Sequence, residues 1–241
     1  VAPTVKAGDD QAVVEGDDVV IGASFTDPGL FDKHSFQIDW GDGTSLTIGI
    51  LDAATHTVTG HHAYADNRAT PYEVKVTVSD FDGGVDTNSL FVTVSNADPV
   101  VHAGGTAIAD EGVLFLLPDT FFSDSGSADT HTVSVDFGDG TIVPATFNSD
   151  GRISAAHVYA DNGSFTATIT VTDDDGGVGT GNWAVTVNNV APVAGDDRYE
   201  TNEDTPLSIP VRGVLANDTD VPADTLTAVV ETGPAHGSLA L

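Results

Sequence analysis

The chain has 241 residues, 37 of them acidic and 7 lysine or arginine, so its formal net charge at pH 7 is −30. Such a charge repels nucleic acid and anionic membrane surfaces and favours divalent cations as partners. Cysteine is absent, which excludes disulfides and thiolate metal sites, whereas an apolar fraction of 40% predicts folded domains rather than a disordered acidic chain.

Strand signals dominate the first part of the chain, and helix signals are nearly missing. Residues 72–78 alternate between apolar and polar side chains, as a half-buried strand does. Asp42–Gly43 lies between two such runs and predicts a hairpin, because this dipeptide tolerates positive φ. Residues 94–100 end a strand and contain Pro99, which predicts a short, stiff linker.

The same order of elements then returns. Residues 131–137 and 165–171 alternate as strands, Asp139–Gly140 predicts a second hairpin, and residues 187–193 form a second linker with Pro192. The repeat includes the loop motifs Asp-(Trp/Phe)-Gly-Asp-Gly-Thr at 39–44 and 136–141, His-x-Tyr-Ala-Asp-Asn at 62–67 and 157–162, and Asp-x-Asp-Gly-Gly-Val at 80–85 and 173–178. The two copies of the first motif begin 97 residues apart (136 − 39), and a period of this length corresponds to a whole domain and not to a solenoid unit.

We therefore predict an all-β protein of tandem antiparallel β-sandwiches with about seven strands in each copy. The motifs resemble those of polycystic-kidney-disease (PKD) domains of bacterial surface and secreted proteins. This resemblance implies tandem immunoglobulin-like antiparallel β-sandwiches, in which the Trp40 or Phe137 ring fills the core and the Tyr64 or Tyr159 ring braces a corner. The expected domains are 1–97, 98–190 and an incomplete one at 191–241.

The last segment has a different pattern. It contains Asn202-Glu203-Asp204-Thr205-Pro206, Val214-Leu215-Ala216-Asn217-Asp218-Thr219-Asp220 and Gly233-Pro234-Ala235-His236-Gly237. These motifs resemble the bacterial cadherin-like tandem repeat of large adhesins, of which about the first half is present. Half of a sandwich cannot bury its apolar face alone, so the segment is expected to be poorly ordered, paired with another chain, or completed by further residues.

Acidic residues in the loops are the candidate calcium ligands, because calcium takes six to eight oxygen ligands and would bridge carboxylates that otherwise repel one another. In the expected topology, the loop before the Trp40 or Phe137 strand and the Asp-Gly-Gly loop converge at the end where the chain enters each domain. The candidates are Asp27, Asp32, Asp80 and Asp82 in the first copy, Asp98 in the linker, and Asp124, Asp129, Asp173 and Asp175 in the second copy. In the last segment the resemblance to the cadherin-like repeat implies Glu203, Asp218, Asp220 and Asp224, which match its acidic positions.

The linker brings the exit loop of the first copy, with Asp66–Asn67, toward the entry loops of the second, which predicts a calcium site between the domains. Asp161–Asn162 lies at the equivalent exit of the second copy. The alternative interpretation is that Asp, Asn and Gly form turns on solvated loops.

Other polar residues have structural interpretations. Asp42 and Asp139 are explained by their hairpins. His34 and His131 lie beside the acidic loops, where a ring nitrogen can bond a carboxylate and hold the loop. His61 and His62 point to opposite faces of a strand and cannot easily bind one zinc ion.

Three functions remain open, and the favoured one is a calcium-stiffened stalk. In that interpretation, the chain is a spacer of a large bacterial extracellular or cell-surface protein and contacts neighbouring repeats of the same chain. The second makes the domains adhesive toward polysaccharide or another surface protein, with Phe31, Phe121 and Phe122 as candidate contacts. The third is the accessory region of a secreted hydrolase. No catalytic constellation stands out, so we expect no enzyme, and no run approaches the roughly 20 apolar residues that cross a bilayer.

Overall fold

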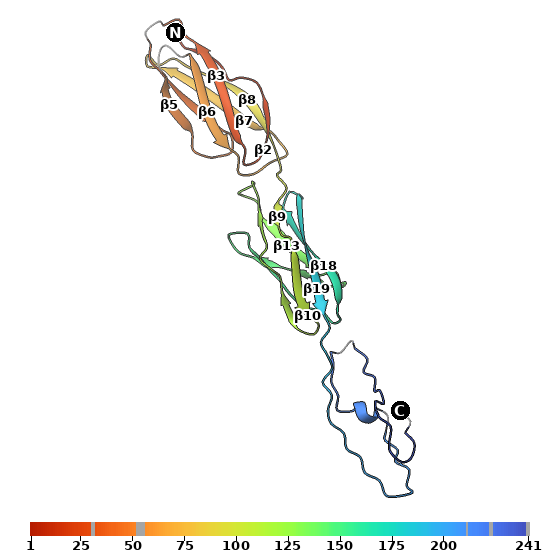
Figure 1. Ribbon diagram of the computed structural model, residues 1–241. Helices are drawn as coiled ribbons and strands as arrows, with labels where there is room; N and C mark the ends of the chain where they lie inside the picture. Colours follow the sequence, from red (N-terminus) through yellow and green to blue (C-terminus); the bar gives the residue numbers. More distant parts are fainter. Residues whose placement is uncertain (30–31, 52–55, 211, 222–223, 240–241) are drawn as a thin grey trace. The chain divides into compact units, whose positions relative to one another are not determined.

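The computed structural model describes residues 1–29, 32–51, 56–210, 212–221 and 224–239, and the described part of the two repeats is built from strands (Figure 1). Among these residues the one helical element is a 3₁₀ turn, η1, at Gly213–Leu215. No helix in the described part of the chain is long and apolar enough to cross a membrane.

The first repeat is a sandwich of a five-stranded and a three-stranded sheet, with strand orders β2-β8-β7-β4-β5 and β1-β3-β6. The strands are β1 (Thr4–Lys6), β2 (Gln11–Val14), β3 (Asp18–Thr26), β4 (His34–Asp39), β5 (Thr47–Leu51), β6 (Thr57–Ala63), β7 (Tyr72–Asp80) and β8 (Val85–Ser95). The predicted strand at 72–78 is β7, in which every second side chain from Tyr72 to Asp80 is buried. The alternation thus places one face of the sheet in the core.

One strand departs from the antiparallel pattern. β1 pairs antiparallel with β3, whereas β2 pairs parallel with β8 in the other sheet. Between β1 and β2 the chain passes Gly8, whose φ is 103° and whose position would bring a Cβ within 3.2 Å of the Gly22 carbonyl oxygen. A glycine here therefore lets the first strand change sheets without reversing direction.

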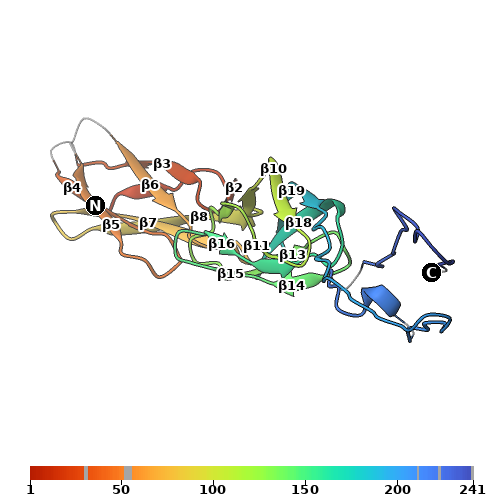
Figure 2. The same ribbon diagram turned by 60° about the horizontal axis from the view of Figure 1, so that its bottom comes forward.

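The second repeat has the same large sheet, with strand order β10-β19-β18-β13-β14. Smaller pairs, β12-β9 and β11-β17, take the place of the three-stranded sheet, and β15-β16 forms a ribbon visible in Figure 2. The strands are β9 (Val100–His102), β10 (Thr106–Asp110), β11 (Leu114–Leu116), β12 (Phe121–Ser123), β13 (His131–Asp136), β14 (Ile142–Pro144), β15 (Thr146–Phe147), β16 (Ile153–Ser154), β17 (Ala156–Val158), β18 (Gly163–Asp173) and β19 (Val178–Asn188).

The long strand β3 of the first repeat corresponds to two short strands, β11 and β12, in the second. Pro118 lies between them and has no N–H for a ladder hydrogen bond, so the strand is interrupted. Trp183 donates from Nε1 to the Thr120 hydroxyl at 3.0 Å and holds this irregular stretch against β19. The predicted strands at 131–137 and 165–171 are present as β13 and β18.

Both predicted hairpins are present, since β4 pairs with β5 and β13 with β14. Gly43 and Gly140 have φ values of 83° and 95°, as the dipeptide signal predicts. The first turn is longer than two residues because the chain leaves the ladder after Asp39, whose carboxylate accepts the Gly41 N–H.

The core aromatic residues lie as the PKD resemblance implies. Trp40 is 2% exposed and Phe137 is fully buried. The Tyr64 hydroxyl donates to the Trp40 carbonyl at 2.9 Å, and the Tyr159 hydroxyl donates to the Phe137 carbonyl at 3.2 Å. Each tyrosine therefore ties its corner to the strand that carries the core ring.

This contact makes a testable prediction. Tyr64→Phe should lower the free energy of unfolding by about 1–2 kcal/mol, because it leaves the buried Trp40 carbonyl without this donor while keeping the ring. Tyr159→Phe should cost no more, since its hydrogen bond is longer. Urea unfolding measures both. An unchanged midpoint for Tyr64→Phe would mean that the hydroxyl contributes nothing to stability.

The last segment contrasts with the repeats. Among its described residues the regular elements are η1 and an antiparallel bridge between Val193 and Thr219. The apolar side chains Leu207, Val229 and Leu239 are exposed. The described part of this segment therefore contains no strand that the structure assigns.

Candidate metal sites

Acidic side chains meet in four places within the described residues. In each place three carboxylates offer oxygens within 4.8 Å of one another. The groups are Glu15, Asp124 and Asp129; Asp66, Asp129 and Asp175; Asp27, Asp32 and Asp80; and Glu111, Asp161 and Asp224.

The first two groups share Asp129 and form one cluster of five carboxylates, which we call the Asp129 cluster: Glu15, Asp66, Asp124, Asp129 and Asp175. All five lie in a single compact unit, made of Val1–Val101, Phe122–Thr132 and Val171–Gly179. The cluster thus combines acids of the first repeat with acids from two loops of the second.

Glu15 is placed by the turn after β2. Its own N–H donates to the Ser95 carbonyl, and the next amide, Gly16, donates to the Tyr64 carbonyl. The side chain is 1% exposed, and its Oε1 accepts the Ala97 N–H of the linker at 2.7 Å. Within the described residues Oε2 has no hydrogen-bond partner. A buried carboxylate oxygen without a donor is costly unless a cation or proton meets it.

Asp129 lies at the centre of the cluster. Both of its carboxylate oxygens are buried and lack a hydrogen-bond partner within the described residues. Gly126 makes room for this side chain, because a Cβ there would overlap the Asp129 carboxylate. Burial, followed by the charges of Glu15 and Asp124, raises the pKa of Asp129 to about 6. Burial likewise raises the pKa of Glu15, against the lowering effect of the Ala97 amide.

The donor set fits calcium. The five carboxylates can supply a large part of the six to eight oxygen ligands that calcium takes, and all of their donor atoms are hard oxygens. Three of their oxygens are buried without a protein donor: Glu15 Oε2 and both oxygens of Asp129. Magnesium demands stricter octahedral geometry, so a loop-borne set of this kind favours the larger ion.

The equivalent loops of the first repeat bring together Asp27, Asp32 and Asp80. Asp27 accepts the Gly29 N–H at 2.9 Å and the His34 Nε2 contact at 2.7 Å, and these two bonds hold its pKa below the usual value. Asp80 accepts the amides of Asp82 and Gly84 through Oδ1, whereas Oδ2 has no partner within the described residues. This group therefore has one buried free oxygen and one carboxylate already used by the fold.

The remaining sequence candidates have separate surroundings. Asp173 accepts amides of Asp175 and Gly177 through Oδ1 and the Asn96 side-chain amide through Oδ2. Its pKa is lowered because these hydrogen bonds outweigh burial, which acts to raise it. Asp173 thus has donors for both oxygens and holds the linker.

Five other candidates join none of the acidic groups found in the part of the chain that the structure describes: Asp82, Asp98, Glu203, Asp218 and Asp220. Asp218 accepts the Gly195 N–H at 2.7 Å, and Asp220 accepts the Val221 N–H at 2.9 Å. Of the four candidates in the last segment, Asp224 is the one that meets other acids, and those acids belong to the second repeat.

Sequence reasoning missed Glu15 and Glu111 as candidate ligands. Both precede a glycine at the end of an alternating stretch, in Val13-Val14-Glu15-Gly16 and Ala109-Asp110-Glu111-Gly112. A repeated acidic residue at the boundary between strand and turn is the signal that could have identified them. Asp66 and Asp161, expected at the exits, lie in groups with acids from the following segment.

The histidines bind carboxylates, as the structural interpretation predicts. His34 pairs with Asp27, and His131 pairs with Asp124 at 2.8 Å. The hairpin residues do more than turn the chain, since Asp42 contacts His62 Nε2 and Asp139 contacts His157 Nε2, each at 2.6 Å. His62 also stacks on Trp40, and His157 stacks on Phe137. His61 and His62 contact different partners, since His61 bonds Asp18.

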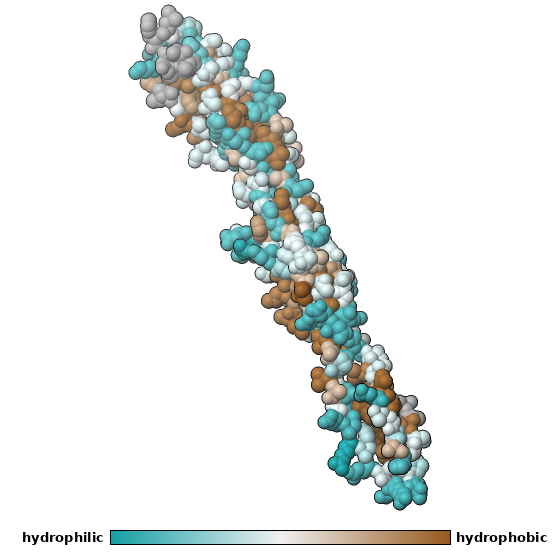
Figure 3. All heavy atoms as spheres, in the orientation of Figure 1, coloured by the Kyte–Doolittle hydropathy of each residue, from teal (hydrophilic) through white to brown (hydrophobic). Residues whose placement is uncertain are grey.

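The aromatic candidates for an exposed contact differ from one another. Phe122 is buried, and Phe121 is 37% exposed and stacks on His102. Phe31 lies outside the described residues. Aliphatic side chains gather instead near β10 of the second repeat, which Figure 3 shows as a brown surface. There Ile108, Leu114 and Leu116 are mostly exposed.

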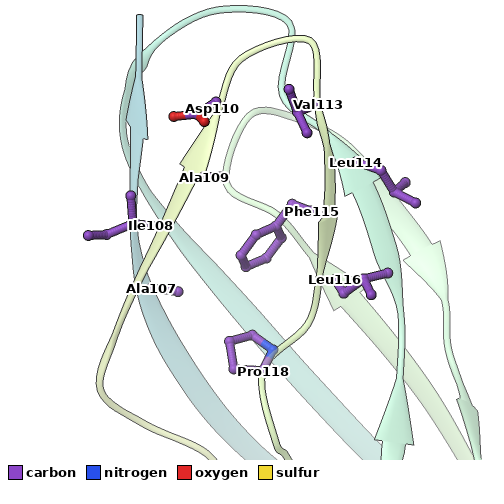
Figure 4. Close-up of a pocket in the computed structure, with 9 residues that line it drawn as sticks. All are labelled: Ala107, Ile108, Ala109, Asp110, Val113, Leu114, Phe115, Leu116 and Pro118. Atoms are coloured by element: carbon purple, nitrogen blue, oxygen red, sulfur yellow. The ribbon is translucent and has the colours of Figure 1, made fainter.

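These side chains line a shallow groove of about 400 Å³ between β10 and β11 (Figure 4). β10 is at the edge of the large sheet, and β11 belongs to a two-stranded pair. The Phe115 ring closes the floor of the groove and is 7% exposed. The groove therefore offers aliphatic surface and a strand edge.

Comparison with known families agrees with the repeat. The family model described as "PKD domain" matches residues 1–94 and 96–187, and the one described as "Bacterial Ig domain" matches residues 188–241. No curated protein matches the chain. The crystal structure of the N-terminal Ig1-2 module of the Drosophila receptor protein tyrosine phosphatase DLAR is similar over 78% of this chain and all of that chain, with 10% identity and a TM-score of 0.31.

PKD and bacterial Ig domains are typical of extracellular or surface proteins and are typically non-catalytic. The PKD matches cover most of the chain and contain both copies of each repeated loop motif. The chain belongs to the PKD domain family and carries two PKD domains in tandem, followed by a bacterial Ig segment.

Proposed function

We propose that the chain is a non-enzymatic spacer of a bacterial extracellular or surface protein, in which calcium fastens consecutive domains. The observation that supports this most strongly is the Asp129 cluster, where acids from the first repeat and from two loops of the second share a site with three buried oxygens that lack protein donors. The partners of each domain are then its neighbours in the same chain.

Contacts along the linker support a fixed rather than a flexible connection. The Ala97 amide bonds Glu15, and the Asn96 side chain bonds Asp173 at 2.9 Å. The Ala128 amide donates to the Ala65 carbonyl, so a loop of the second repeat also bonds the exit loop of the first. These bonds leave the clustered charge as the main opposing force, and a divalent cation would neutralise it.

Calcium binding and its mechanical effect can be measured together. Calorimetric titration of the native chain should give saturable calcium binding. Calcium should also raise the melting temperature and protect residues 94–100 from proteases, because an ion that binds the folded state stabilises it by mass action. Small-angle scattering with calcium and with EGTA should show a narrower distribution of particle dimensions with calcium.

Asp82→Asn is the matched control, since Asp82 is an exposed acid that joins no acidic group within the described residues. It should bind calcium as the native chain does. If neither chain binds calcium, and chelation changes neither melting nor cleavage, the acids are solvated loop residues and the proposal is wrong.

The groove between β10 and β11 favours an adhesive role as the second candidate. Its lining is aliphatic, which suits an extended protein segment better than a polysaccharide, because sugars are usually bound on exposed aromatic rings. The edge strand β10 could pair with a strand of a second copy.

Sedimentation velocity should then detect self-association that Ile108→Asp abolishes. A concentration-independent monomer would contradict this role.

A further inference from the structure

The exit end of the second repeat is built like the exit end of the first. Glu111 follows β10 as Glu15 follows β2, and its N–H donates to the Asn188 carbonyl as that of Glu15 donates to Ser95. The next amide, Gly112, donates to the Tyr159 carbonyl. Glu111 is 1% exposed, and its Oε1 accepts the Val190 N–H of the second linker at 2.6 Å.

As in Glu15, the second carboxylate oxygen of Glu111, Oε2, is buried and has no hydrogen-bond donor among the described residues. It belongs to a group with Asp161 and Asp224 in which the three ligand atoms lie within 4.8 Å of one another. Glu111 is thus deeply buried, with one oxygen engaged by the linker and the other without a donor, and it belongs to a group with two further carboxylates; a buried carboxylate in this position is suited to bind a cation.

The third acid comes from the last segment. Asp224 lies in the same compact unit as Glu111 and Asp161. Nearby, Val221 packs against the Glu111–Gly112 turn, since a Cβ on Gly112 would lie 3.2 Å from Val221 Cγ1. The Asp224 amide donates to the Val221 carbonyl, so the acid is bonded to the residue that packs against the Glu111–Gly112 turn.

We propose that Glu111, Asp161 and Asp224 form a second calcium site, which fastens the segment 191–239 to the second repeat. The segment has few regular elements of its own within its described residues, so a cation at this point would be a major part of its tertiary connection. This inference rests on the proposed function in that the site would bind the same kind of ion, calcium. It uses none of the residues of the Asp129 cluster.

Asp224→Asn is the informative variant, because Asp224 is partly exposed and its replacement does not disturb the core of the second repeat. The readouts are calorimetric stoichiometry and hydrogen exchange with calcium and with EGTA. At a calcium concentration ten times the dissociation constant, exchange in residues 191–239 of the native chain should slow about tenfold. Asp224→Asn should lose this protection and one bound calcium. The calcium-dependent slowing of exchange expected at residues 124–131, which carry Asp124 and Asp129 of the Asp129 cluster, should persist.

Glu203→Gln is the control, since Glu203 is an acid of the same segment that joins no acidic group in the described ranges. It should retain both the stoichiometry and the protection of the native chain. Asp224→Asn with unchanged stoichiometry and unchanged protection would overturn the second site. If calcium does not slow exchange at residues 124–131 of the native chain, the proposed function is contradicted instead, so the two failures are distinguishable.

Discussion

Asp129→Asn is expected to raise the melting temperature of the chain in EGTA at pH 7.5 and to remove most of the stabilisation by calcium. In EGTA the native Asp129 is a buried carboxylate whose two oxygens lack protein donors and whose neighbours are four other acids. Asparagine has a similar shape and no charge. It therefore relieves the repulsion and also removes the proposed central ligand.

The size of the effect follows from the pKa of Asp129, which is raised from 3.8 to about 6. A shift of this kind corresponds to at most roughly 3 kcal/mol, and partial exposure reduces the expected gain to about 1–2 kcal/mol. For a domain of this size each kcal/mol changes the melting temperature by about 4–8 °C.

The pH dependence has a definite sign. A carboxyl with a raised pKa binds its proton more tightly in the folded state, so its stabilising contribution is present below pH 3.8 and is lost as the pH rises to about 6. In EGTA, the difference in melting temperature between Asp129→Asn and the native chain should thus grow between pH 4 and 6 and stay constant above. Calorimetric scans at several pH values measure it.

The control for this prediction is Asp82→Asn, which removes one exposed negative charge from the neighbouring repeat. It should change the melting temperature little in either buffer. Equal destabilisation by Asp129→Asn in EGTA and in calcium would mean that this carboxylate serves the fold through hydrogen bonds and does not bind a cation.

The repeated sandwich could be predicted because its determinants are local. The alternation in β7 and β18, the Asp-Gly hairpins and the core rings of Trp40 and Phe137 are all visible as short patterns. The split of the long strand into β11 and β12 was harder to foresee. It depends on Pro118 together with the contact that Trp183 makes with Thr120 across the fold.

The candidate sites were predictable only in part, because their members come from distant segments. The convergence of Asp124, Asp129 and Asp175 with Asp66 follows from the expected ends of the sandwich. Glu15 is harder to identify, since a glutamate before a glycine looks like an ordinary turn residue and only its repetition as Glu111 distinguishes it in the sequence. Its suitability as a cation ligand depends on its burial and on the Ala97 amide of the linker, which donates to Oε1 while Oε2 has no donor among the described residues.

The same reasoning explains why Asp173 differs from Asp129. Both are acids of loops in the second repeat, and sequence patterns alone make them equal candidates as ligands. Asp173 receives amides of its own loop and the Asn96 side chain, so its charge is satisfied by hydrogen bonds. Asp129 receives none in the described part of the chain. Local donors therefore decide which acid holds the loop and which remains available to a cation.

Gly177→Ala is expected to cost about 2–4 kcal/mol of unfolding free energy in the second repeat and to weaken calcium binding at the Asp129 cluster. A Cβ at this position would overlap the Asp173 carboxylate and would lie 2.6 Å from both Asn96 Nδ2 and Asp98 Oδ1. These groups belong to the loop and the linker, so the strain falls on the connection between the repeats. Asp175, a proposed ligand of the Asp129 cluster, is two residues away.

Gly176→Ala and Gly176→Asn separate crowding from backbone strain. Gly176 has a φ of 93°, and a Cβ added there would meet no described atom within 4 Å, so alanine at this position meets only conformational strain, which asparagine tolerates better. Gly176→Asn should therefore be close to native, whereas Gly177→Asn should be as damaging as Gly177→Ala. Thermal unfolding measures the loss of stability, calcium titration measures the weakening of calcium binding, and cleavage at residues 94–100 measures the strain on the linker. Equal behaviour of the two glycine positions would show that the packing of Gly177 against Asn96 and Asp98 does not hold the linker.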